Sequence, residues 1–186
     1  GGSGNKFPSG FFLFPLVYYS DIPIRMVCRE SVTMKVAELS NKQTRTRRYN
    51  AFGRYMKALF GQPVYKVNVD AGFTCPNRDG TVGVTGCVYC NNDSFRPSEC
   101  KAEKTITEQV KKGIDTFQSD QSKKFLVYFQ PYSNTYAPVD KLKALYDEAL
   151  SVSDVVGLIV GTRPDCLPQD TLDLLASYAQ RCYFWL

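Results

Sequence analysis

The sequence predicts an α/β protein built on a parallel sheet, and two observations carry the prediction. Short apolar or alternating stretches at 64–70, 125–129, 155–160 and 182–186 alternate with segments of helical periodicity. Strands that alternate with helices of about a dozen residues form parallel sheets with right-handed crossovers. Cysteine-rich, polar or charged segments also follow the first three stretches directly. Ligands of such sheets bind beyond the carboxyl ends of the strands, so these segments are expected to converge on one site.

The first expected element is a helix over 48–60, because apolar side chains recur there at helical spacing. Gly61 supplies its C-terminal stop and Pro63 prevents its continuation. The aromatic side chains of this helix are interpreted as core residues rather than as a platform for nucleobases. Its apolar face consists of Tyr49, Phe52, Met56, Leu59 and Phe60.

The later elements follow from local patterns. Residues 64–70 alternate between apolar and polar, as a strand does, while 125–129 and 155–160 are nearly continuous apolar runs typical of buried parallel strands. Thr105 and Glu108 form a capping box that opens a second helix. Pro138 and Pro168 begin two more helices. The expected inward-facing residues of these three helices are Ile106, Val110, Ile114, Phe117, Val139, Leu142, Leu145, Tyr146, Ala149, Leu172, Leu175 and Tyr178.

Composition narrows the possible functions. The chain has 186 residues, an apolar share of 44%, a net charge of +5 and no histidine. The lack of histidine excludes Ser-His-Asp catalysis, Cys-His catalysis and His-ligated zinc within this chain. Seven cysteines, an odd number, and no evident secretory signal indicate a reduced, cytoplasmic setting. The apolar run at 11–19 is too short to span a bilayer, so no membrane association is expected.

Residues 75–90 carry the chemistry that the sequence suggests. Cys75, Cys87 and Cys90 are spaced C-x11-C-x2-C, and the intervening loop contains three glycines that allow tight turns. Structural zinc sites close with four ligands, whereas a cubane iron–sulfur cluster with three cysteines keeps one iron open. The alternative is a zinc-binding module in which Cys100 supplies the fourth ligand.

Three motifs resemble one protein family. They are GFTCPNRDGT with GCVYCN in the cysteine loop, VYFQPYSNTYA at 127–137 and GLIVGTRPDC at 157–166. Together and in this order they resemble the YhcC/YtqA-like branch of the radical S-adenosylmethionine (radical SAM) superfamily, near the catalytic-subunit group of Elongator. The resemblance covers residues 49–186. The usual superfamily spacing is C-x3-C-x2-C, so the long first gap is a departure.

The resemblance implies a partial parallel (β/α) barrel of radical SAM type, ending after its fourth strand. Cys75, Cys87 and Cys90 would hold a [4Fe-4S] cluster whose open iron binds S-adenosylmethionine, and an electron donor such as flavodoxin or ferredoxin would reduce it. Reductive cleavage would then yield a 5′-deoxyadenosyl radical. Tyr89 matches an aromatic position that contacts adenine in the superfamily. Gln130 and Asn134 lie where family members bind the methionine part.

Arg163 and Asp165 follow the third strand. They are interpreted either as a surface turn pair or as a binding site for ribose or substrate. The remaining cysteines, Cys28, Cys100, Cys166 and Cys182, are expected to be ordinary reduced thiols.

The chain divides into two expected parts: an irregular N-terminal extension over 1–47 and the N-terminal part of the barrel over 48–186. The extension includes a basic cluster at Lys42, Arg45, Arg47 and Arg48. Such a cluster is either a solvated arm or a phosphate-binding arm. The Elongator-like resemblance and this arm favour tRNA as substrate, with tRNA modification as the activity. A small-molecule or protein substrate is the alternative, and a non-catalytic fragment is a third class.

Overall fold

The computed structural model describes residues 49, 51–91, 104–117 and 123–186. Its elements alternate as expected. The strands are β1 (Val64–Val69), β2 (Lys124–Phe129), β3 (Val155–Val160) and β4 (Tyr183–Trp185). The helices are α2 (Phe52–Phe60), α3 (Ile106–Asp115), α4 (Val139–Leu150) and α5 (Gln169–Arg181), with a short 3₁₀ turn η2 (Pro164–Cys166) after β3. The expected extension over 1–47 lies outside the described residues.

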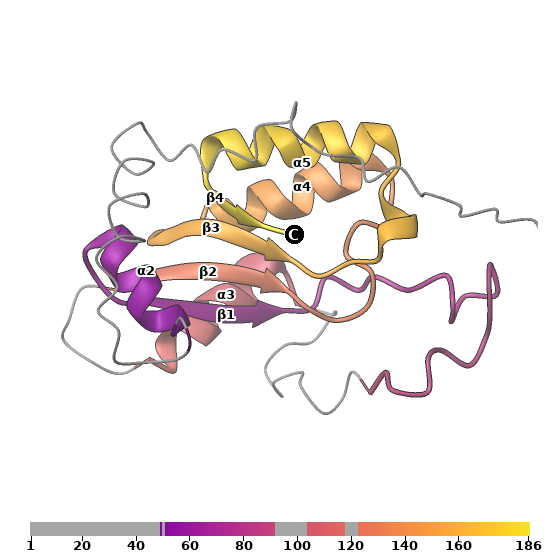
Figure 1. Ribbon diagram of the computed structural model, residues 1–186, viewed down its shortest axis with the longest axis horizontal. Coiled ribbons are helices and arrows are strands. Elements are labelled where there is room, and N and C mark those ends of the chain that lie inside the picture. The colour runs from indigo at the N-terminus through magenta and orange to yellow at the C-terminus, as the bar shows by residue number, and fades with distance from the viewer. Residues whose placement is uncertain (1–48, 50, 92–103, 118–122) are drawn as a thin grey trace, which may run out of the picture.

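The four strands form one parallel sheet in the order β1-β2-β3-β4 (Figure 1). The parallel sheet ordered along the chain is therefore confirmed. In the described residues, α3, α4 and α5 each lie in the chain between two neighbouring strands, which is the crossover that parallel strands require.

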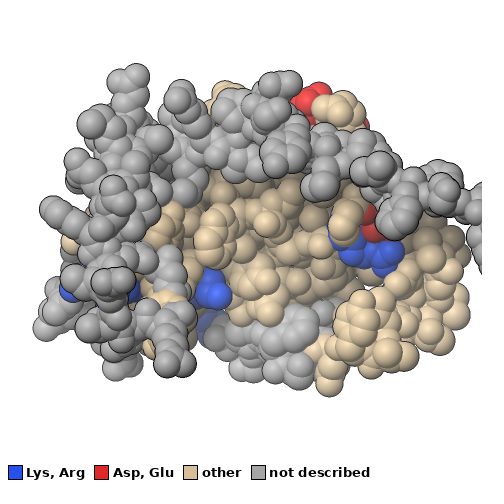
Figure 2. Space-filling view, viewed as in Figure 1, with Lys and Arg blue, Asp and Glu red and all other residues tan. Residues whose placement is uncertain are grey.

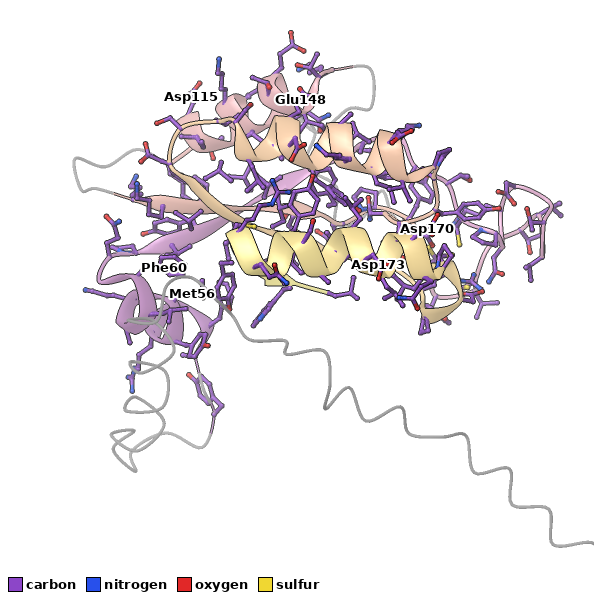
Figure 3. All side chains as sticks on the ribbon, turned by 90° about the horizontal axis from the view of Figure 1, so that it is seen from above. Met56, Phe60, Asp115, Glu148, Asp170 and Asp173 are labelled. Carbon is purple, nitrogen blue, oxygen red and sulfur yellow. The ribbon has the colours of Figure 1, made fainter. Side chains whose placement is uncertain are left out.

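Helices cover both faces of the sheet. One core cluster joins Val127, Phe129 and Leu158 of the strands to the apolar sides of α3, α4 and α5. A second cluster on the opposite face joins Leu126 and Ile159 to α2. Seen from above, α2 with Met56 and Phe60 lies on one side of the sheet, and α3 and α4 lie on the other (Figure 3). Successive side chains of a strand point to opposite faces of the sheet, so the strands contribute residues to both core clusters.

Several local expectations hold and two do not. The Thr105–Glu108 capping box is present, with both of its hydrogen bonds formed, and Gly61 ends α2 at a φ of 74°. Met56 and Leu59 are buried, which confirms α2 as a core helix. Tyr49 was expected on its packed face, but the helix begins at Phe52 and Tyr49 is 66% exposed. Leu172 is only half-buried, and Thr171 takes the buried position on α5.

Candidate functional site at the carboxyl ends of the strands

The three segments expected to converge do meet at one edge of the sheet. Direct backbone hydrogen bonds connect them. The Ser133 amide donates to the Thr74 carbonyl at 3.2 Å, and the Asn134 amide donates to the Gly161 carbonyl at 3.0 Å. The cysteine loop, the β2–α4 loop and the β3–α5 loop thus lie together beyond the arrowheads in Figure 1. Basic and acidic atoms gather at the same edge in the space-filling view (Figure 2).

A buried glutamine on α3 sets where the cysteine loop leaves the sheet. Gln109 has no exposed surface, and its side-chain amide pairs with both backbone groups of Asp70 at 2.8 Å each. The Asp70 carboxylate in turn accepts the Gly72 amide at 2.9 Å. The chain is therefore held rigidly just before Cys75. The helical pattern alone did not single out Gln109, because a polar residue on a helix is normally solvated.

Backbone turns fold the loop between the cysteines. The Arg78 and Asp79 amides both donate to the Cys75 carbonyl, at 2.8 and 3.1 Å. The Gly86 amide donates to the Asn77 carbonyl at 2.8 Å, and the Cys90 amide donates to the Cys87 carbonyl at 2.9 Å. The long first gap is thus a compact folded loop rather than a loose insertion.

Two side chains of this loop contact the Cys87–Cys90 pair. The Asn77 Nδ2 donates to the Cys87 Sγ at 3.1 Å, and the Arg78 Nη2 donates to the Cys90 carbonyl at 3.0 Å. The Arg78 guanidinium also lies over the Tyr132 ring, 5.8 Å from its centroid. Sequence reasoning did not assign a role to either residue. Their proximity to sulfur depends on the turn geometry, for which the C-x11-C spacing contains no signal.

Arg163 reaches Cys75 from the end of β3. Its Nη1 donates to the Cys75 Sγ at 3.4 Å, while its Nε and Nη2 bind the two carboxylate oxygens of Asp165 at 2.9 and 2.6 Å. Burial raises the pKa of the Cys75 thiol, but the Asn77 amide, the Ser133 hydroxyl and Arg163 outweigh it and leave that pKa below its ordinary value. The thiolate form that binds metals is thereby favoured.

The expected cofactor-binding residues have different surroundings. Tyr89 is 86% exposed, and its hydrogen bond to Cys87 raises its pKa. The Gln130 Oε1 accepts from the Asn68 Nδ2 at 2.9 Å on the sheet face that α2 partly covers. Asn134 is fully buried, and its Nδ2 donates to the Phe129 and Gly161 carbonyls. The Asn134 side chain therefore cross-links the ends of β2 and β3.

Two buried polar atoms beside the cysteine loop have no hydrogen-bond partner among the residues that the structure describes. They are the Asn134 Oδ1 and the Ser133 Oγ. The Ser133 hydroxyl lies close enough to lower the pKa of the thiols of both Cys75 and Cys166, although its geometry to either sulfur is not that of a hydrogen bond. Buried polar atoms without partners are costly, so they mark a place where a bound group would compensate.

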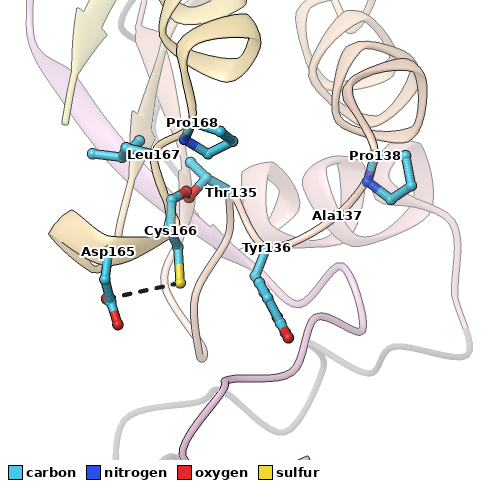
Figure 4. Close-up of a pocket in the computed structure, with 8 residues that line it drawn as sticks. All are labelled: Thr135, Tyr136, Ala137, Pro138, Asp165, Cys166, Leu167 and Pro168. Atoms are coloured by element: carbon cyan, nitrogen blue, oxygen red, sulfur yellow. Dashed lines mark hydrogen bonds between the residues drawn. The ribbon is translucent and has the colours of Figure 1, made fainter. Parts of the chain in front are cut away.

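An open hollow of about 650 Å³ lies between the β2–α4 and β3–α5 loops, at the starts of α4 and α5 (Figure 4). Tyr136 and Cys166 line it. The Tyr136 hydroxyl also hydrogen bonds the Thr81 Oγ1 of the cysteine loop at 3.1 Å. Cys166 is buried, and burial together with Asp165 raises its pKa, which agrees with an ordinary protonated thiol.

The donor set suits a thiolate-bound group. Cys75, Cys87 and Cys90 are free thiols on one loop, and two of their sulfurs face N–H donors. Across residues 49, 51–91, 104–117 and 123–186, however, no three Cys, Asp or Glu side chains are close enough to hold a metal ion as they stand. The loop would therefore adjust its cysteine side chains on binding. Cys28 and Cys100, and with Cys100 the four-cysteine zinc arrangement, lie outside the described residues.

Two glycines of the loop allow a matched test of this geometry. Gly80 and Gly86 both have positive φ, 93° and 77°, but a Cβ on Gly86 would also lie 2.8 Å from the Arg78 guanidinium. Either change to Ala should cost about 1 kcal/mol of backbone strain. Gly86→Ala should cost about 1 kcal/mol more, because it displaces Arg78 from the Cys90 carbonyl. Chemical denaturation of both variants checks this, and equal losses would contradict the role given to Arg78.

Within the part of the chain that the structure describes, no helix has the length and apolar character needed to cross a membrane.

Comparison with known proteins finds similar sequences. No family model and no solved structure matches the chain. It is 43% identical to the protein YhcC of Escherichia coli K12 over 138 residues, which cover 74% of this chain and 44% of that protein. It is 38% identical to YtqA of Bacillus subtilis over 143 residues, covering 75% and 44%, and 40% identical to MJ0486 of Methanocaldococcus jannaschii over 139 residues, covering 73% and 42%. The chain therefore spans less than half the length of these relatives, and their names state no activity.

Proposed function

We propose that this chain is the cluster-binding part of a radical SAM enzyme. The observation that carries the proposal is the placement of Cys75, Cys87 and Cys90 on one folded loop at the carboxyl edge of a parallel sheet. The electropositive surroundings of Cys75 support it, because thiolates are the ligands of iron–sulfur clusters. The similarity to YhcC and YtqA, over about three quarters of this chain, is compatible with the proposal.

In this proposal, Cys75, Cys87 and Cys90 hold three irons of a [4Fe-4S] cluster, and S-adenosylmethionine binds the fourth. When bound and reduced by an electron donor such as flavodoxin or ferredoxin, the cluster would supply the electron that cleaves S-adenosylmethionine to a 5′-deoxyadenosyl radical. The chain's own residues position the ligands: Gln109 holds the start of the loop, and the turns within the loop bring Cys87 and Cys90 back to Asn77 and Arg78.

The residues proposed to contact S-adenosylmethionine are Tyr89, Gln130, Asn134, Arg163 and Asp165. The exposed ring of Tyr89 beside Cys87 is available to stack on adenine. Of Asn134, only the partnerless Oδ1 is available to a ligand, since its amide nitrogen is already bound to two carbonyls.

Anaerobic reconstitution with iron and sulfide tests the proposal. The expected product is brown, contains four irons and four acid-labile sulfides per chain by the cubane stoichiometry, and releases 5′-deoxyadenosine from S-adenosylmethionine after reduction. A colourless protein that retains zinc and takes up no iron would contradict the proposal and favour the zinc-binding alternative.

We further propose tRNA as the substrate, with wobble-uridine modification as the activity. The basic segment 42–48, which lies outside the described residues, motivates this. Each phosphate contact made by such an arm should steepen the plot of log affinity against log salt concentration by about one unit. Removing residues 35–48 should therefore weaken binding to bulk tRNA and flatten its salt dependence. Absence of tRNA binding at low salt would exclude RNA and leave a small molecule or protein as substrate.

A further inference from the structure

The sulfurs of Cys75 and Cys87 each accept an N–H hydrogen bond from a residue outside the Cys-x-x-Cys turn. Asn77 donates its side-chain amide to Cys87, and Arg163 donates its Nη1 to Cys75. The donors come from different parts of the chain, the loop itself and the end of β3. Neither contact follows from the ligand spacing, and neither donor is itself a candidate ligand.

Arg163 is held in place for this contact. Its other two nitrogens form a fork with both oxygens of Asp165, which leaves Nη1 directed at the sulfur of Cys75. A bidentate pair of this kind restricts the guanidinium to one orientation. Because Arg163 is paired with Asp165, the sulfur meets an oriented N–H group of an ion pair rather than an isolated positive charge.

Asn77 is held equally firmly. Its carbonyl accepts the Gly86 amide at 2.8 Å. Its side-chain amide donates to the sulfur of Cys87.

We propose that Asn77 and Arg163 are positioning residues that orient the Cys87 and Cys75 sulfurs and raise the reduction potential of the cluster they hold. This inference rests on the proposed function. Reduction adds negative charge that is shared by the thiolate sulfurs, so N–H donors stabilise the reduced state more than the oxidised state. Asp165 acts through Arg163 by setting its orientation.

Redox titration of the reconstituted protein, followed by electron paramagnetic resonance, tests this inference. Asn77→Leu and Arg163→Gln should each shift the one-electron equilibrium about tenfold toward the oxidised cluster, which corresponds to about 59 mV in the negative direction. Arg163→Lys keeps the charge but lacks the fork, so its potential should resemble that of Arg163→Gln. The matched control is Arg54→Gln on α2, an exposed residue at the opposite end of the sheet, whose potential should equal that of the wild type.

The outcomes separate this inference from the proposed function. Potentials unchanged in Asn77→Leu and Arg163→Gln, or wild-type potential in Arg163→Lys, would overturn the positioning role. Loss of cluster with an unchanged unfolding transition would support it, since the thiolates would then no longer be held. If the wild type takes up no iron, the proposed function fails. Cobalt(II) affinity, read from thiolate charge-transfer absorption, then decides the inference: a loss of about tenfold or more in the variants supports it, and equal affinity overturns it.

Discussion

Replacing Cys75, Cys87 or Cys90 with Ala should abolish cluster assembly and the cleavage of S-adenosylmethionine. Each thiolate is proposed to hold a different iron, so the loss of one leaves two attachment points for a cubane that requires three protein ligands. Iron and sulfide contents after anaerobic reconstitution should fall to background in all three variants, and the brown absorption should disappear. No partial retention is expected at Cys87 or Cys90, which are half-buried like Cys75.

The control is Cys182→Ala. Cys182 is buried after α5 and its thiol donates to the Tyr178 carbonyl, away from the loop. This variant should keep full iron content even if its stability decreases slightly. A Cys100→Ala variant that loses metal as completely as Cys87→Ala would instead favour the four-cysteine zinc site.

The largest expected effect on stability is at Gly157, where β3 pairs with β4. A Cβ there would collide with the backbone carbonyl and the side chain of Tyr183, the residue with which Gly157 is paired. Gly157→Ala should therefore push β4 away from the sheet and reduce the free energy of unfolding by about 3 kcal/mol. Displacement of β4 also exposes the core cluster that Tyr183 shares with Met56 and Leu59.

The single tryptophan reports this change directly. Trp185 lies on β4, and its ring packs against Phe52 and Tyr183 at centroid distances of 5.6 and 6.1 Å. Its emission should shift to the red in Gly157→Ala. The matched control is Gly53→Ala on α2, where a Cβ meets nothing within 4 Å. That variant should be as stable as the wild type or more stable by up to about 1 kcal/mol. Similar stabilities for the two variants would contradict the packing described for β3 and β4.

The parts of the fold that the sequence predicted are those with a local cause. The period of two in β1, the apolar runs of β2 and β3, and the Thr105–Glu108 capping box each depend on residues within a few positions of one another. The start of α2 was predicted too early, at 48 instead of Phe52, because the apolar spacing continues before the first helical turn and nothing local marks the boundary.

Sequence alone determined the parallel strand order, the three cysteines as candidate ligands and the edge of the sheet at which they lie, because alternation of strands and helices restricts topology strongly. Only the tertiary structure decided which side chains face the sulfurs. Arg163 is 88 residues from Cys75 in sequence, and Asn77 reaches Cys87 through a turn that the spacing does not encode. Contacts of this kind depend on the relative placement of strand ends and on hydrogen bonds such as those of Gln109 to Asp70, which only folding brings together.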